Sequence, residues 1–194
     1  MSRRYIESAV LAVALTTGAP WTPSLTGGVA AAQTLTQEAA LRLAFPGADG
    51  VERRTAYLDD DQLARAAELA GREAEVTSGV ITYYVAAKDG IPLGVAYFDV
   101  HRVRTLPEVL MIVVDTDHRV RRVEVVRFAE PPEYLAPAGW LAQFQGRPLD
   151  TALSVKGSVA NITGATLTAR AATAAVRRVL ALHRVIAPFG EEGG

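Results

Sequence analysis

Four stretches in the middle of the chain are rich in the branched and aromatic residues that favour β-strands. Turn residues separate them: Lys88-Asp89-Gly90 predicts a tight hairpin turn, and Asp115 to His118 predicts another. Consecutive strands joined by such short turns form an antiparallel sheet. The predicted strands are Val80–Ala87, Leu93–Val100, Val109–Asp115 and Val120–Phe128.

Three further segments are predicted to be helices. The first begins at Thr36, a capping residue, and stops at Pro46, while the second covers about 60–69. The third runs from Thr166 to about 187, with apolar residues at spacings of three and four, and Pro188 ends it. Together with the strands, these helices predict an α+β fold, a small antiparallel sheet flanked by helices.

Composition restricts the classes of function that the chain can have. It has 194 residues, of which 49% are hydrophobic, and a formal net charge of -1, which suits one globular domain and gives no indication of nucleic-acid binding. The absence of cysteine excludes disulfides, thiolate-held clusters and thiol catalysis.

We predict no metal site. The three histidines are scattered, and His183 is most simply a residue at the boundary of the last helix. The acidic run Asp59–Asp61 superficially resembles a metal site, but capping of the second helix is the simpler interpretation.

The N-terminus indicates export. Residues 1–32 have the pattern of a signal peptide: Arg3 and Arg4, an apolar stretch from Ala9 to Leu15, and Ala30-Ala31-Ala32 as the cleavage site. The alternative is an uncleaved anchor, but the apolar stretch is shorter than the roughly twenty residues that span a bilayer. We therefore expect a periplasmic or otherwise exported protein, with one domain over residues 33–190 and a disordered tail at 191–194.

The segment from Asn161 to Thr168 has the composition of an anion site. Thr163 is a natural N-cap for the last helix, and the small residues Gly164 and Ala165 allow a phosphate to approach the backbone. The hydroxyl of Thr166, in or near the first helical turn, is then placed to carry a phosphoester. The alternative is that Thr163 merely caps a surface helix.

The motif Thr163-Gly164-Ala165-Thr166 and its context resemble the FMN-binding domain family, in which the phosphate of FMN is esterified to the last residue of this tetrad. The resemblance covers roughly fifty residues and includes an upstream Gln143-Phe144-Gln-Gly146-Arg147 segment. It implies covalently bound FMN on Thr166 and an electron-transfer function. Relatives include the FMN-bearing subunits of the Rnf and sodium-pumping NADH:quinone reductase complexes.

Two positions depart from the family pattern. Ala160 stands where members usually carry an aspartate that assists the flavin transferase, so the sequence supports flavin binding more firmly than covalent attachment. The segment Arg127 to Tyr134 keeps only a Glu-x-Pro skeleton of a motif found in the two complexes. We therefore expect a stand-alone relative.

The resemblance implies a flavin site with a phosphate end and a ring end. Arg147 and Lys156 are candidates to neutralise the phosphate, whereas the aromatic residues near Glu130 are candidates to enclose the ring, although such loop aromatics are as often part of the core. We assign no acid, base or nucleophile for substrate turnover. The predicted FMN-binding residues are Thr163, Gly164, Ala165, Thr166, Leu167, Thr168, Glu130, Tyr134, Trp140 and Phe144.

The implied partners are a flavin transferase, which transfers FMN to Thr166 once, and a redox protein, either in the membrane or outside it. Two other interpretations stay open. One is an exported module that binds a protein or a small anion and has lost flavinylation. The other is a flavin reductase with dissociable FMN, although the chain has no Gly-x-Gly-x-x-Gly phosphate loop.

Overall fold

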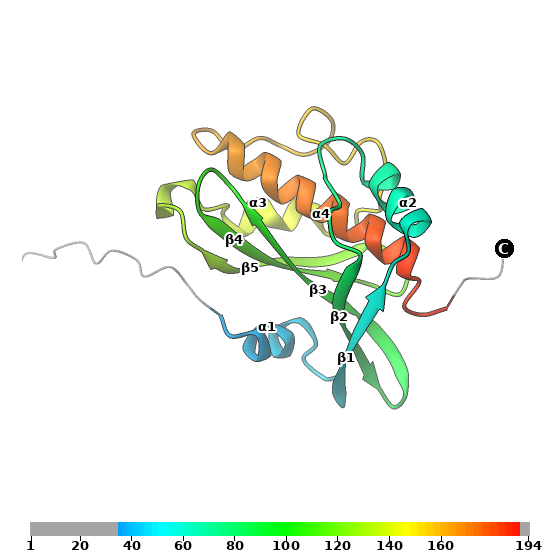
Figure 1. The fold of residues 1–194 in the computed structure, drawn as a ribbon. Helices are drawn as coiled ribbons and strands as arrows, with labels where there is room; N and C mark the ends of the chain where they lie inside the picture. Colours follow the sequence, from blue (N-terminus) through cyan, green and yellow to red (C-terminus); the bar gives the residue numbers. More distant parts are fainter. Residues whose placement is uncertain (1–34, 191–194) are drawn as a thin grey trace, which may run out of the picture.

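The computed structural model describes residues 35–190, so the predicted export signal and tail lie outside the described residues. Within this range the chain forms a five-stranded sheet in which each strand pairs antiparallel with the next (Figure 1). Its order follows the sequence: β1 (Gly50–Tyr57), β2 (Val80–Lys88), β3 (Ile91–Arg102), β4 (Pro107–Val114) and β5 (Val120–Phe128).

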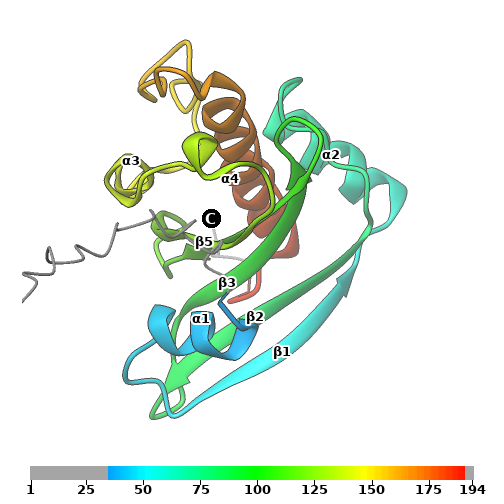
Figure 2. The same cartoon turned by 90° about the vertical axis from the view of Figure 1, so that its left-hand side faces the viewer.

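The helices cover the two faces of this sheet unequally (Figure 2). Helix α1 (Gln37–Ala44) lies against one face, and the long helix α4 (Thr166–Ile186) lies against the other, with α2 (Asp60–Ala70) and α3 (Ala138–Leu141) on the same side. Two short 3-10 turns, η1 (Pro132–Tyr134) and η2 (Ala142–Phe144), flank α3. No helix within residues 35–190 has the length and apolar character needed to cross a bilayer.

Both faces of the sheet contribute to a hydrophobic core because successive side chains of a strand point to opposite faces. In β4, Leu110 and Ile112 face α4, whereas Met111 and Val113 face α1, and all four are fully buried. The core beneath α4 is the larger of the two, and it fixes the helix whose first residue is Thr166.

The predicted α+β fold is confirmed, and the four predicted strands correspond to β2 through β5. The hairpin turn is also present, with positive φ angles at Asp89 and Gly90. Strand β1 has no counterpart among the predicted strands. This strand lies at the edge of the sheet and most of its side chains stay in solvent, so its sequence is polar and lacks the strand pattern.

The capping interpretation of the acidic run is confirmed. Asp59 accepts a hydrogen bond from the Gln62 backbone at 2.8 Å, and the Gln62 side chain accepts one from the Asp59 backbone at 3.1 Å. This reciprocal capping box starts α2.

The prediction for His183 is wrong, because this residue is 1% exposed and lies in the core. Its Nδ1 lies 2.9 Å from the hydroxyl of Tyr97, and its Nε2 lies 3.0 Å from Nδ1 of His118. Burial, with a smaller contribution from His118, lowers the pKa of His183 to about 3. Helical spacing alone does not predict this burial, since the rings around His183 belong to Tyr97, His118 and Phe189, which all lie outside the helix.

Candidate functional site

Thr166 is the first residue of α4, at the end of a tightly turned segment. Gly164 has a φ of +82°, a conformation that side chains disfavour, and the space beside its Cα is open. The half-buried Thr166 side chain accepts a hydrogen bond from Nδ2 of Asn161 at 3.1 Å. The hydroxyl is therefore oriented by a neighbour five residues earlier.

The start of α4 offers backbone donors that no described side chain caps. Ala165 is the N-cap, and its carbonyl accepts the first helical bond, from the Ala169 N–H at 3.1 Å. The prediction that Thr163 caps the helix is thus wrong, because the turn at Gly164 leaves Thr163 two residues before the N-cap position. The N–H groups of Thr166, Leu167 and Thr168 have no hydrogen-bond partner among residues 35–190, which makes this end attractive to an anion.

A pocket of about 320 Å³ lies over this helix start. Thr168 fixes one wall, since its hydroxyl donates to the carbonyl of Tyr134 at 2.6 Å. The structure therefore brings Tyr134, one of the predicted FMN-binding residues, next to the tetrad, whereas Thr163 precedes the pocket without lining it. The lining residues are Arg104, Tyr134, Gly164, Ala165, Thr166, Leu167 and Thr168.

Arg104 is a site residue that the sequence analysis misses. It comes from the loop between β3 and β4, and its guanidinium carbon lies 4.6 Å from the centroid of the Tyr134 ring. The two cations predicted for the phosphate are engaged elsewhere. Arg147 donates to the carbonyls of Gln143 and Ser158, and Lys156 is an exposed side chain 3.9 Å from Glu73.

Glu130 holds the loop that carries Arg104. Its Oε1 accepts from the backbone N–H groups of Arg104, Thr105 and Leu106, at 3.2, 2.7 and 2.8 Å. The bonds from Leu106 and Thr105 lower the pKa of the carboxyl. Glu130 is 8% exposed, and its hydrogen bonds are to this loop, so its predicted part in FMN binding stays a prediction.

Trp140 and Gln143 hold the backbone that leads into the tetrad. The indole Nε1 of Trp140 donates to the carbonyl of Ala160 at 2.7 Å, and Oε1 of Gln143 accepts from the N–H of Ala160 at 2.8 Å. Phe144 is fully buried in the core and packs edge-on against Trp140. The structure thus places these two predicted aromatic residues outside the pocket, and Trp140 holds the irregular segment that leads to Thr166.

Comparison with known proteins agrees with this geometry. Residues 107–181, from β4 through most of α4, match the sequence profile of the FMN-binding domain. Over this segment the chain is similar to the FMN-binding domain family. The matched region contains the tetrad and Glu130, while Arg104 lies just before it. No curated protein sequence matches the chain.

The fold has a counterpart among solved structures. The crystal structure of Shewanella oneidensis NqrC superposes with a TM-score of 0.51 at 16% sequence identity, and the match covers 79% of this chain and 91% of that one. At this identity the similarity shows the fold alone. It confirms the α+β class expected for an FMN-binding domain.

The residues present at the pocket fit the phosphate end of FMN. Three backbone donors start α4, the open space at Gly164 admits a bulky group, and Arg104 supplies a positive charge. The Tyr134 ring also lines the pocket, and the Arg104 guanidinium lies over it. Sequence spacing could find the tetrad but not Arg104, since that residue belongs to no motif and its position depends on the hydrogen bonds of Glu130.

Proposed function

We propose that this protein is an exported electron carrier that holds FMN through a phosphoester on Thr166. The observation that carries the proposal is the position of the Thr166 hydroxyl. It lies at the uncapped start of α4, in a pocket that also contains Arg104. The FMN-binding profile over residues 107–181 supports the choice of cofactor.

Attachment would be a single maturation step with FAD as the donor. The Oγ of Thr166 would form a bond to the phosphorus of the FMN half, the pyrophosphate bond of FAD would break, AMP would leave, and the hydroxyl proton would pass to the transferase or solvent. Asn161 orients the hydroxyl through its 3.1 Å bond, and the free N–H groups of α4 stabilise the charge on the remaining phosphate oxygens.

Bound FMN would accept electrons in pairs and release them singly, so the carrier would link two-electron donors to one-electron acceptors. The protein residues supply retention and orientation. Tyr134 would offer its ring to the flavin, and Glu130 would keep Arg104 in place through the loop before β4. We assign no residue to substrate turnover.

The proposal includes a compartment outside the cytoplasm and two partner proteins. The signal-like residues 1–32 would direct the protein to the periplasm or its equivalent, where a covalent bond prevents loss of the cofactor. A flavin transferase would act once, and a redox protein, in the membrane or outside it, would exchange electrons with the carrier.

One observation favours a second candidate function, an exported binding module without attached flavin. Ala160 stands where the family usually has an aspartate, and its exposed side chain offers no group to a transferase. Both backbone groups of Ala160 are held by Trp140 and Gln143, so an aspartate at this position would keep the same backbone path.

Co-expression with a flavin transferase tests the proposal. The exported protein should carry flavin absorbance that persists after denaturation and gel filtration. Thr166→Ala should lose it, whereas Thr163→Ala, a matched change in the same tetrad, should keep it. A colourless wild-type protein that turns yellow on Ala160→Asp would support the module that has lost flavinylation, and flavin released on denaturation would support reversible binding.

A further inference from the structure

The ladder between β2 and β3 stops halfway along the two strands. Its last pair at this end is Tyr83 with Tyr97. Beyond it, residues 80–82 of β2 pair only with β1, and residues 98–102 of β3 pair only with β4. The sheet is therefore open between these two segments, where residues Arg178, Val179 and Leu182 of α4 line the opening.

On the β3 side of the opening, Phe98 and Val100 direct their backbone groups into the gap. Alternate residues of an antiparallel strand bond to alternate neighbours. In the β3–β4 loop the N–H of Val103 donates to the carbonyl of Leu106, so the odd-numbered residues of β3 bond toward β4. The register from 95 to 102 has no bulge, which leaves the even-numbered residues facing β2.

On the β2 side the same reasoning applies. The carbonyls of Gly79 and Ala87 accept from residues at the two ends of β1, so the odd-numbered residues of β2 bond toward β1. Val80 and Thr82 consequently face the gap. The hydroxyl of Ser78 takes up both backbone groups of Val80, accepting from its N–H at 3.2 Å and donating to its carbonyl at 3.1 Å.

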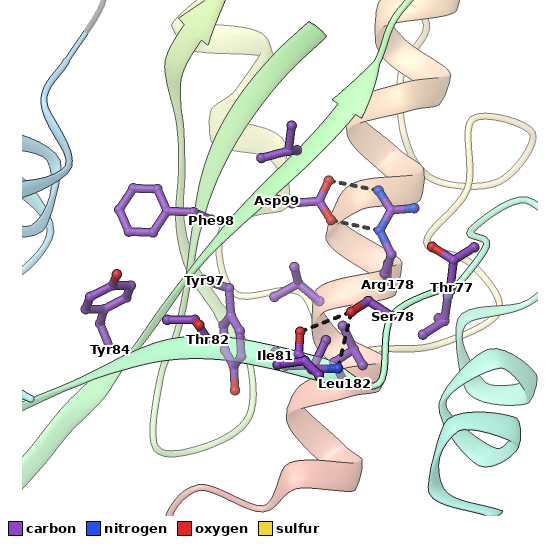
Figure 3. Close-up of a pocket in the computed structure, with 14 residues that line it drawn as sticks. Thr77, Ser78, Ile81, Thr82, Tyr84, Tyr97, Phe98, Asp99, Arg178 and Leu182 are labelled. Carbon is purple, nitrogen blue, oxygen red and sulfur yellow. Dashed lines mark hydrogen bonds and ion pairs between the residues drawn. The ribbon is translucent and has the colours of Figure 1, made fainter. Parts of the chain in front are cut away.

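A cavity of about 370 Å³ occupies the opening (Figure 3). Its charged lining groups neutralise each other, since Arg178 makes a two-pronged ion pair with Asp99 at 2.7 and 2.8 Å. Its rim is apolar: Val80 is 56% exposed and Val100 is 69% exposed. The cavity thus combines free backbone amides, hydroxyl groups and apolar side chains without a free charge.

We propose that this gap binds an extended, uncharged segment of a partner polypeptide, which inserts as a strand between β2 and β3. Only a polypeptide backbone repeats donors and acceptors with the spacing that Thr82, Phe98 and Val100 present on the two walls. The valines of the rim would contact alternate apolar side chains of the segment. The inserted strand would complete the sheet, and its binding does not depend on flavin.

The probe is an acetylated and amidated hexapeptide of alternating threonine and valine, titrated into the full exported chain. Amide signals measured by NMR should shift saturably at Thr82, Phe98 and Val100, and hydrogen exchange there should slow on binding. Methylation of alternate peptide nitrogens, which removes donors while keeping the side chains, should abolish the effect.

Two variants locate the site. Val100→Pro removes a donor that faces the gap and that β4 does not use, so the peptide should bind on the order of threefold to tenfold more weakly. Val100→Thr keeps the donor and should bind as the wild type does. Thermal melting of each variant checks the fold, and the methylated peptide tests the same bonds without any change in the protein.

Three results would overturn the proposal. The first is the absence of saturable binding by the hexapeptide. The second is binding that the methylated peptide reproduces or that shifts amides away from the gap. The third is slow exchange of Thr82, Phe98 and Val100 in the free protein, which would mean that β2 closes onto β3 in solution.

Discussion

The guanidinium of Arg104 lies over the ring of Tyr134, with 4.6 Å between its central carbon and the ring centroid. These residues come from different loops, and each is fixed by a separate bond. Glu130 holds the backbone of Arg104, and the hydroxyl of Thr168 holds the carbonyl of Tyr134. The pair therefore places a permanent positive charge and an aromatic face beside Thr166 in one pocket.

Arg104 should contribute to binding of the phosphate. In a Thr166→Ala background, where FMN can bind only reversibly, Arg104→Gln should weaken FMN binding by about tenfold to a hundredfold, as expected for a lost charge-assisted bond. The affinity for riboflavin, which lacks the phosphate, should fall much less. Fluorescence titration measures both affinities, and Lys156→Gln is the matched control. Equal losses for FMN and riboflavin would assign Arg104 to the ring instead.

Glu130 should make the free energy of unfolding depend on pH in the acidic range. Because its pKa is lowered in the folded protein, the stability that its charge contributes is present above the ordinary value of 4.5 and disappears as the pH falls through the folded pKa. The difference in unfolding free energy between wild type and Glu130→Gln should therefore shrink below about pH 4.5 in urea titrations. A difference of constant size across this range would contradict the assigned role, and Glu133→Gln serves as the exposed control.

His101 should make the free energy of unfolding fall as the pH rises into the alkaline range. Burial lowers its pKa, but hydrogen bonds to Asp99 and Glu108 outweigh burial and raise the pKa to about 9. Stability from the charged ring is complete below 6.5 and is lost as the pH rises through 9. The stability advantage of wild type over His101→Asn should fall across this interval in chemical denaturation. If the advantage instead stayed level up to pH 9, the ring would not be charged in the folded protein.

Phe144 should stabilise the protein without flavin. Because its side chain is fully buried beneath α4, Phe144→Ala should lower the free energy of unfolding of the flavin-free protein by about 3–5 kcal/mol. Trp140→Phe keeps the packing but loses the bond to Ala160, so it should cost only about 1 kcal/mol. If Phe144→Ala left the free energy of unfolding of the flavin-free protein unchanged, Phe144 would not be a core residue and its predicted contact with the flavin ring would be favoured.

Short sequence patterns predict the elements whose structure depends on neighbouring residues. The apolar strands, the capping box at Asp59 and the start of α4 at Thr166 each depend on residues close in sequence. Strand β1 is not predicted because most side chains of this edge strand are exposed, and its sequence therefore contains few apolar residues. Its pairing with β2 is set by the register of the neighbouring strand and not by its own pattern.

The candidate site was predictable only at its phosphate end. Arg104 and Glu130 are 26 residues apart in sequence, and nothing in either segment indicates that one carboxylate collects the N–H groups of the loop that carries the arginine. Likewise, Tyr134, Trp140 and Phe144 lie close together in sequence, which predicts a single aromatic cluster. The fold separates them, with Tyr134 at the pocket, Trp140 against Ala160 and Phe144 in the core.

Mass spectrometry of the exported protein can show whether Thr166 carries FMN. After co-expression with a flavin transferase, the intact mass should increase by one FMN less one water. Fragmentation should place the added mass on Thr166 and not on Thr163 or Thr168. An unmodified Thr166 in a protein exported beside an active transferase, or an added mass on either neighbouring threonine, would contradict the account.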